Sequence, residues 1–133
     1  YTSLIPHLLV PGIRQALSER TAPLLWIANV DEQEGETEGM DLRAHLTALE
    51  THGGAGLVDG ILATSVSTKN RPTATGTPIA PHLTPRAQGE RAGDPPIYTR
   101  DVVSRLRPHL HDSNLLARAV MNVAPSLRRR LHR

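Results

Sequence analysis

Polar side chains follow an apolar stretch early in this sequence, at a place where they could bind a ligand. Asn29 lies near the end of the run PLLWIANV, and Glu36 and Thr37 lie between the glycines of the acidic stretch DEQEGETEG. A polar side chain at the end of an apolar strand satisfies nearby backbone amides or faces a ligand. Glycines allow close approach of a backbone to a ligand, and a carboxylate binds sugar hydroxyls or a cation. The alternative for the acidic stretch is a solvated charged turn, and the residues alone leave both interpretations open.

Histidines supply further candidates. His109, His111 and Asp112 form the densest group of potential metal ligands, HLHD. A metal site is one interpretation of this group, and a loop that ends in a helix N-cap is the simpler one. His45 lies on the apolar face of a predicted helix, where a buried, hydrogen-bonded histidine is the simpler interpretation. No spacing typical of a zinc site, a hydrolase triad or a complete phosphate loop occurs in the sequence.

Hydroxyl groups come together at the first three residues. Tyr1, Thr2 and Ser3 precede a stretch marked by Pro6 and Pro11, and their hydroxyls and amides suit an anion. The signal from these residues alone is weak.

Composition excludes several classes of protein. The net charge is +2, and the only dense basic group is Arg128 to Arg130 with Arg133, so a nucleic-acid interface is not indicated. Cysteine is absent, which excludes disulfides and thiolate metal sites and fits a reducing cytoplasm. No apolar run reaches the roughly 18 residues that a membrane span requires. Aromatic residues make up 2% of the chain, so aliphatic side chains must form the core.

The helices and strands that position these candidate ligand-binding residues are predicted to form a βαβ unit. Spacing predicts a helix over about 12–20, a buried strand over 23–30, a loop over 31–40, a helix over 41–52 capped by its first residue, and a second buried strand over 57–64. Parallel pairing with a right-handed crossover is the default for this order. Ligands of such sheets bind at the carboxyl ends of the strands, where Asn29, the acidic loop and Ser65 would lie.

The second half of the chain changes character. Residues 66–97 are rich in Pro, Thr and Gly. This composition predicts a long variable insertion that lies outside the core. Strand character returns over 98–106 around Val102 and Val103. A helix capped by Asp112 follows, and we expect Ala124 and Pro125 to end it and residues 127–133 to be solvated. The inner face of that helix is predicted to be Leu115, Leu116, Ala119, Val120 and Val123.

Three stretches resemble the CofD/YvcK family. YTSLIPHLLVPGI is similar to the family stretch GPGSLYTSxLPNLLVxGI, and PLLWIANVDEQEGETEG is similar to KVYVCNxMTQPGETxGY. His45 falls at the place of the histidine in the family's DH pair, and HDSNLLARAV resembles the closing RHDxxxLAxAL segment. The resemblance covers about residues 1–65 and 98–123, in the same order and with similar spacing.

The resemblance implies an α/β fold, a Rossmann-like three-layer parallel sheet of which this chain is the C-terminal portion. It divides the chain into a ligand-binding half-domain at 1–65, a variable segment at 66–97, a closing strand and helix at 98–127 and a basic tail at 128–133. The YvcK branch implies a cytoplasmic regulator, a gluconeogenesis factor, that binds UDP-N-acetylglucosamine and supports cell shape and envelope growth. The CofD branch implies instead a transferase of 2-phospho-L-lactate to a deazaflavin precursor, with Mg²⁺ expected only in that case. The resemblance leaves open whether the protein is an enzyme and whether it forms a homo-oligomer.

Ligand-binding residues carry over from the matched motifs as an expectation. They are Tyr1, Thr2, Ser3, Asn29, Gln33, Gly35, Glu36, Thr37, His45, His111 and Asp112. The sequence departs from the family at Glu34, Met40, Ala44 and Leu110, which replace a Pro, a Tyr, an Asp and an Arg. An Arg clamps a diphosphate with two hydrogen bonds, and the Leu found here does not. We find no counterpart of the Tyr and Arg-Pro that lie between the family's last two motifs, and such losses also fit a member kept for partner contacts alone.

Overall fold

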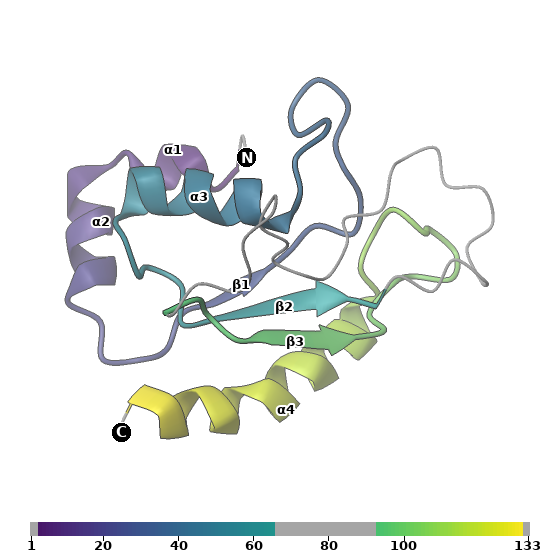
Figure 1. The fold of residues 1–133 in the computed structure, drawn as a ribbon. Helices are drawn as coiled ribbons and strands as arrows, with labels where there is room; N and C mark the ends of the chain where they lie inside the picture. Colours follow the sequence, from purple (N-terminus) through teal and green to yellow (C-terminus); the bar gives the residue numbers. More distant parts are fainter. Residues whose placement is uncertain (1–2, 66–92, 132–133) are drawn as a thin grey trace.

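A computed structural model describes residues 3–65 and 93–131, the last two by their backbone, and shows a parallel sheet with helices on both faces (Figure 1). In chain order the elements are α1 (Ile5–Leu8), α2 (Pro11–Ser18), β1 (Leu25–Ile27), α3 (Leu42–Gly53), β2 (Gly60–Thr64), β3 (Ile97–Arg100) and α4 (Ser113–Leu131). The three strands lie in the order β1-β2-β3, and both pairs are parallel. The predicted α/β class with a parallel sheet is confirmed.

The predicted βαβ unit is formed by β1, α3 and β2. Asp41 caps α3 because its Oδ1 accepts a hydrogen bond from the Ala44 amide at 2.8 Å. Gly54, with φ of 106°, ends the helix in a conformation that glycine adopts readily. The side chains that α3 buries against the sheet are Leu42, His45, Leu46 and Leu49.

The central strand β2 is buried along its whole length because helices cover both of its faces. Ile61 and Ala63 belong to the core under α3, whereas Leu62 belongs to the core under α4. Gly60 allows α4 to approach closely, since a Cβ there would lie 2.6 Å from Leu127 Cδ2. The sheet therefore separates two small aliphatic cores.

The amino ends of β1 and β2 are joined by Arg20 and Asp59. Arg20 donates to the carbonyls of Leu17 and Leu57 at 2.6 Å and to Asp59 Oδ2 at 2.8 Å. Asp59 Oδ2 also accepts the Leu24 amide at 2.6 Å. These hydrogen bonds therefore connect the amino ends of the two strands.

The last helix is longer than predicted. The expectation that Ala124 and Pro125 would end it is wrong, because α4 continues through Pro125 to Leu131. Proline removes the hydrogen bond to the carbonyl four residues earlier, that of Met121, whose exposed position lets water replace the lost donor. Leu127, predicted to be solvated, is 2% exposed and anchors the added turn, whereas Leu115, predicted to face inward, is 40% exposed.

Two other elements differ from the sequence-based expectation. The third strand comes earlier than Val102 and Val103. Val102 is buried under α4 instead, and Val103 forms an isolated antiparallel bridge with His111. The short helix α1 precedes the predicted helix over 12–20 and was not predicted, and Pro6 lies in its first turn, where a missing amide hydrogen costs little. Of the predicted variable segment, residues 66–92 lie outside the described residues.

Candidate functional site

The carboxyl end of β1 brings together side chains from the acidic loop, α3 and the start of α4. Asn29 lies two residues past the strand and is half-buried. Its Nδ2 donates to Gln33 Oε1 at 3.1 Å, so two amide side chains lie side by side at the carboxyl end of the strand. Amide groups that offer both donors and acceptors suit a polar ligand such as a sugar or a base.

The loop after β1 is held by its own threonine. Thr37 is fully buried, and its Oγ1 accepts the Gln33 amide at 2.8 Å while its own amide donates to the Gln33 carbonyl at 2.9 Å. Gly35 adopts φ of 75°, a conformation in which a larger residue would be strained. Glu36 is exposed on the same turn. Thr37 thus shapes the loop, while Glu36 and Gln33 remain at the surface.

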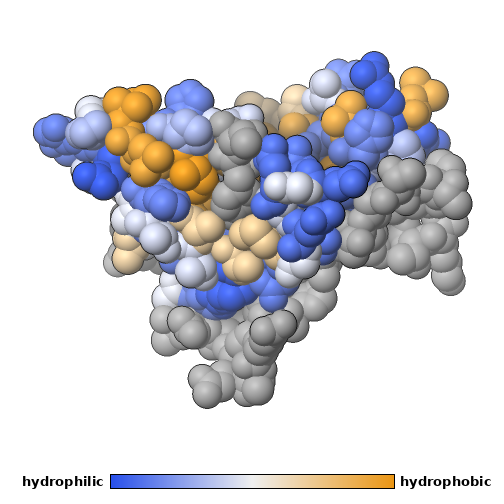
Figure 2. Space-filling model, turned by 90° about the horizontal axis from the view of Figure 1, so that it is seen from above, coloured by the Kyte–Doolittle hydropathy of each residue, from blue (hydrophilic) through white to orange (hydrophobic). Residues whose placement is uncertain are grey.

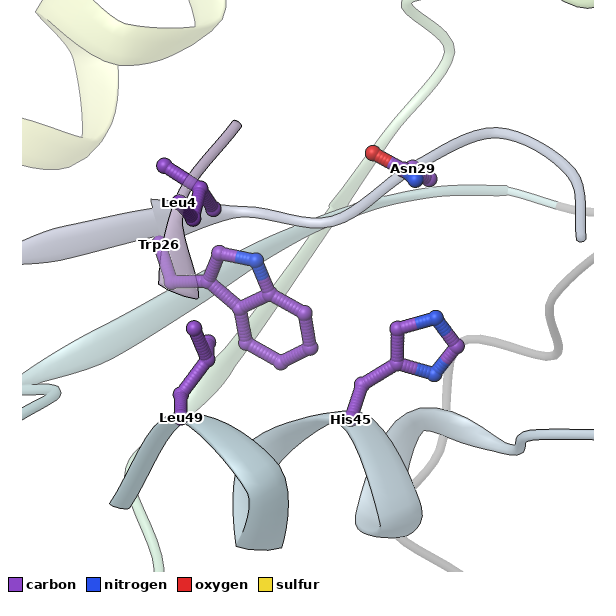
Figure 3. A pocket seen from close by; sticks show the side chains of 5 residues that line it. All are labelled: Leu4, Trp26, Asn29, His45 and Leu49. Atoms are coloured by element: carbon purple, nitrogen blue, oxygen red, sulfur yellow. The ribbon is translucent and has the colours of Figure 1, made fainter. Parts of the chain in front are cut away.

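A small pocket opens beside Asn29 (Figure 3). Its lining comes from the start of the chain, β1 and α3 and comprises Leu4, Trp26, Asn29, His45 and Leu49. Its volume of about 20 Å³ has room for roughly one water molecule. The pocket that the described residues line is therefore too small to hold a nucleotide.

His45 and Trp26 form the apolar side of this pocket. The two rings stack with centroids 6.2 Å apart and planes 23° from parallel. His45 is 1% exposed, and its Nδ1 donates to the Asp41 carbonyl at 2.8 Å, which fixes the ring and places a hydrogen on Nδ1. His45 is therefore buried and hydrogen-bonded, as the simpler interpretation predicted, and it also lines a pocket.

The start of α4 reaches the same end of β1. His111 Nε2 donates to the Ala28 carbonyl at 3.2 Å, next to Asn29. Burial lowers the pKa of His111, and the hydrogen bond to Ala28 opposes this shift in part. Asp112 caps α4 as predicted, since its Oδ1 accepts the amides of Asn114 and Leu115 at 3.0 Å.

The expected ligand residues fall into three groups. Around the carboxyl end of β1, Asn29 and His45 line the pocket, Gln33 bonds to Asn29, and His111 bonds to Ala28. Gly35, Thr37 and Asp112 shape the loop and the helix start, and Glu36 is exposed on that loop. Ser3 is exposed at the start of the described chain, and Tyr1 and Thr2 lie outside the described residues.

Sequence reasoning missed the apolar part of the pocket. Trp26 is the single tryptophan of the chain and was counted only as a strand residue, although a tryptophan near the end of a buried strand is a usable signal. Leu4 and Leu49 carry no such signal, because only the packing of α1 and α3 brings them to the pocket. Among residues 3–65 and 93–131 no three His, Asp or Glu side chains are grouped as a metal site, and no helix there is long and apolar enough to cross a bilayer.

Comparison with known proteins supplies the family. Residues 1–80, more than half of the chain, match the sequence model of the CofD family, described as 2-phospho-L-lactate transferase CofD. The chain belongs to the CofD family. This confirms the resemblance seen in the sequence motifs.

Individual relatives agree with this CofD assignment. A gluconeogenesis factor of Halalkalibacterium halodurans is 50% identical over 62 residues, which are 47% of this chain and 19% of that protein. A protein of Nostoc sp. is 33% identical over 117 residues, which are 87% of this chain and 23% of that protein. The chain thus spans less than a quarter of the length of these relatives.

A solved structure shares the fold. The crystal structure of a UPF0052 family member from Bacillus halodurans superimposes with a TM-score of 0.67 at 27% sequence identity. The match covers 91% of this chain and 39% of that chain. The CofD-like fold is therefore shown for most of the chain.

Proposed function

We propose that this CofD-family chain is part of a cytoplasmic regulator that binds a nucleotide sugar, with UDP-N-acetylglucosamine as the expected ligand, and that acts in cell shape and envelope growth under gluconeogenic conditions. The name of the relative from Halalkalibacterium halodurans, gluconeogenesis factor, supports the physiological part. The site supports the ligand class. The observation that carries the proposal is that Asn29 and His45 line one pocket at the carboxyl end of β1, where parallel sheets bind their ligands, with Gln33 bonded to Asn29 and His111 bonded to the neighbouring Ala28.

The described residues suit one side of such a ligand. The Asn29 and Gln33 amides would bond to hydroxyls or to the base, and the glycine-flanked Glu36 would accept hydrogen bonds from the sugar. The expected roles of Tyr1, Thr2, Ser3, Gly35, Thr37 and Asp112 belong to this proposal too. Leu110 stands where relatives are expected to have an Arg, so the diphosphate loses a bidentate partner and we expect modest affinity.

Titration calorimetry on the full-length protein tests the proposal. UDP-N-acetylglucosamine should bind, and Asn29→Ala should weaken binding by about tenfold or more, because one polar contact to a ligand is worth roughly 1–3 kcal/mol. Asn122→Ala is the matched control, since Asn122 is exposed on α4. Absence of heat at millimolar ligand, with the protein folded, rejects the proposal.

The family description favours a second candidate, a transferase of 2-phospho-L-lactate to a deazaflavin precursor. Mg²⁺ would be expected to assist such a transfer. The described residues offer no three-ligand group for a metal, so we derive no step through it. Incubation of the full-length protein with nucleotide-activated donor, acceptor and Mg²⁺ decides the point, since lack of product removes this candidate.

A further inference from the structure

The carboxyl ends of β2 and β3 bring a hydroxyl and a guanidinium next to each other. We propose that Thr64 and Arg100 form an anion-binding subsite that takes a phosphate of the ligand. This inference rests on the proposed function, because it names the groups that would bind the charged part of a nucleotide sugar. It assigns to Arg100 the positive charge that Leu110 does not supply.

The register of the sheet places the two side chains together. Thr64 is the partner of Arg100 in the parallel pair of β2 and β3, and neighbouring strands lie about 4.8 Å apart. Leu62 and Tyr98, the partners two residues earlier, both pack in the core under α4. Because successive side chains alternate between the two faces of a sheet, Thr64 and Arg100 lie on that same face.

The Thr64 side chain is buried and contributes no bond to the fold. It is 3% exposed, and within the described part of the chain its Oγ1 has no hydrogen-bond partner. Buried hydroxyls are nearly always hydrogen-bonded, since burial removes their bonds to water. An isosteric valine would avoid that cost. The hydroxyl is therefore suited to bond with a ligand oxygen rather than to hold the strands together.

The Arg100 side chain has its charge available. It is exposed, and its Nη1 donates to the carbonyl of the adjacent Thr99 at 2.8 Å. The ion pairs between described side chains use Arg20 and Arg43, and no described carboxylate pairs with Arg100. A guanidinium is planar and donates to two oxygens of a phosphate at once. Arg100 therefore reaches a phosphate without first breaking a salt bridge.

The charge at this end of the sheet is mainly negative. Five acidic residues occur within residues 31–38, and Figure 2 shows hydrophilic side chains gathered over this loop. These carboxylates repel a diphosphate unless a cation offsets them. Positions 28–31, 64–65 and 100–101 end the three strands or follow them directly, and Arg100 is the single basic residue among them.

The strand ends hold the subsite in place. The Ser65 amide donates to the Arg100 carbonyl at 3.0 Å, so β2 and β3 stay paired beyond Thr64. Arg105 and Arg107 are also exposed, but they lie on the loop between β3 and α4. A binding group on a strand is positioned more precisely than one on a loop. This difference favours Arg100 as the phosphate partner.

Titration calorimetry of the full-length protein with UDP and with uridine tests the subsite, because the two compounds differ in the diphosphate. UDP should bind more tightly than uridine. Arg100→Ala should reduce this difference at least about tenfold, since it removes a bond between charged groups. Arg105→Ala is the matched control, because it removes the same charge from an exposed position and should change little.

The outcomes separate this inference from the proposed function. If the unchanged protein binds UDP-N-acetylglucosamine and Arg100→Ala retains the full preference for UDP over uridine, the subsite is wrong and the proposed function stands. Equal losses in Arg100→Ala and Arg105→Ala also overturn the subsite. If the unchanged, folded protein binds neither UDP-N-acetylglucosamine nor UDP, both proposals are rejected.

Thr64→Val gives a second measurement, in which stability and binding respond differently. The unfolding midpoint of the free protein should stay the same or rise, because an unpaired hydroxyl is replaced by a methyl group of similar size. UDP should bind about threefold or more weakly, because one hydrogen bond is lost. Thr99→Val is the control, since Thr99 is exposed on β3 and alternates to the other face. A lower midpoint for Thr64→Val, or unchanged binding of UDP, would contradict the proposal.

Discussion

At the residue scale, the stacked pair of His45 and Trp26 links stability to the pocket. His45→Ala should lower the free energy of unfolding by about 2–4 kcal/mol, because it opens a cavity under Trp26 and removes the bond to the Asp41 carbonyl. Urea unfolding followed by circular dichroism measures this. His109→Ala is the control, since His109 is exposed, and an equal effect of the two changes would contradict the packing described for His45.

A second prediction at this scale concerns the glycine that begins β2. Gly60→Ala should destabilise the protein by about 1–3 kcal/mol, because the new methyl group would meet Leu127 and Tyr98. Gly12→Ala is the matched control, since nothing lies within 4 Å of its added Cβ and the site is helical. That change should stabilise by about 0.5–1 kcal/mol. Thermal unfolding of both variants compares them directly, and a neutral Gly60→Ala would disprove close packing of α4.

Individual residues were predictable where their type conflicts with their position. Asn29 was found because an amide at the end of an apolar strand requires a partner, and Asp41 and Asp112 because caps have a local signature. The stack of Trp26 on His45 was not predicted, since the two residues come from different elements and meet only through tertiary packing. The roles of the expected ligand residues stay predictions.

At the element scale, the start of α4 connects the helix to the end of β1. Burial lowers the pKa of His111 from its ordinary 6.5, so just below that pH the unfolded chain binds a proton that the folded chain does not. Stability that His111 contributes is therefore complete above about pH 6.5 and is lost as the pH falls toward the folded pKa. His111→Gln should reduce the loss of stability between pH 7.5 and 5.5, and measured unfolding midpoints decide this.

The control for His111 is another histidine of the same loop. His109 is exposed, and His109→Gln should leave the pH dependence unchanged. An unchanged pH dependence in the His111→Gln protein would show that burial of His111 does not govern the acid response.

The elements were predicted best where periodicity and caps agree. The helix α3 and the strands β1 and β2 were expected within a few residues, because each has a continuous apolar run or face bounded by Pro, Asp or Gly. The end of α4 was wrong because Pro125 was given more weight than the buried Leu127 beyond it. Tertiary packing overrides local propensity when a buried side chain such as Leu127 lies two residues further along the helix.

At the scale of the whole molecule, one ion pair joins the two halves of the described chain. Arg43 of α3 donates to both carboxylate oxygens of Asp94, which precedes β3, and the Nη1 to Oδ1 distance is 2.7 Å. The Asp94 carboxylate raises the pKa of Arg43, so the guanidinium stays charged. Asp94→Ala should therefore destabilise the protein by about 1–3 kcal/mol, because a mostly buried Arg43 loses its partner.

Chemical denaturation at low and high salt measures this effect. Asp101→Ala provides the comparison, since Asp101 is exposed and follows β3. If both variants lose equal stability, the pair does not hold α3 to the start of β3. The same experiment checks a contact between segments far apart in the sequence, which no local pattern could have predicted.

The single indole of this protein lies on the wall of its pocket, stacked on an imidazole and next to an amide. Intrinsic fluorescence excited at tryptophan therefore originates at the candidate site and nowhere else in the chain. A change in its emission maximum or intensity on addition of a nucleotide sugar reports occupancy without a label. Quenching by a small solute such as iodide further distinguishes a ligand that covers the indole from one that binds elsewhere.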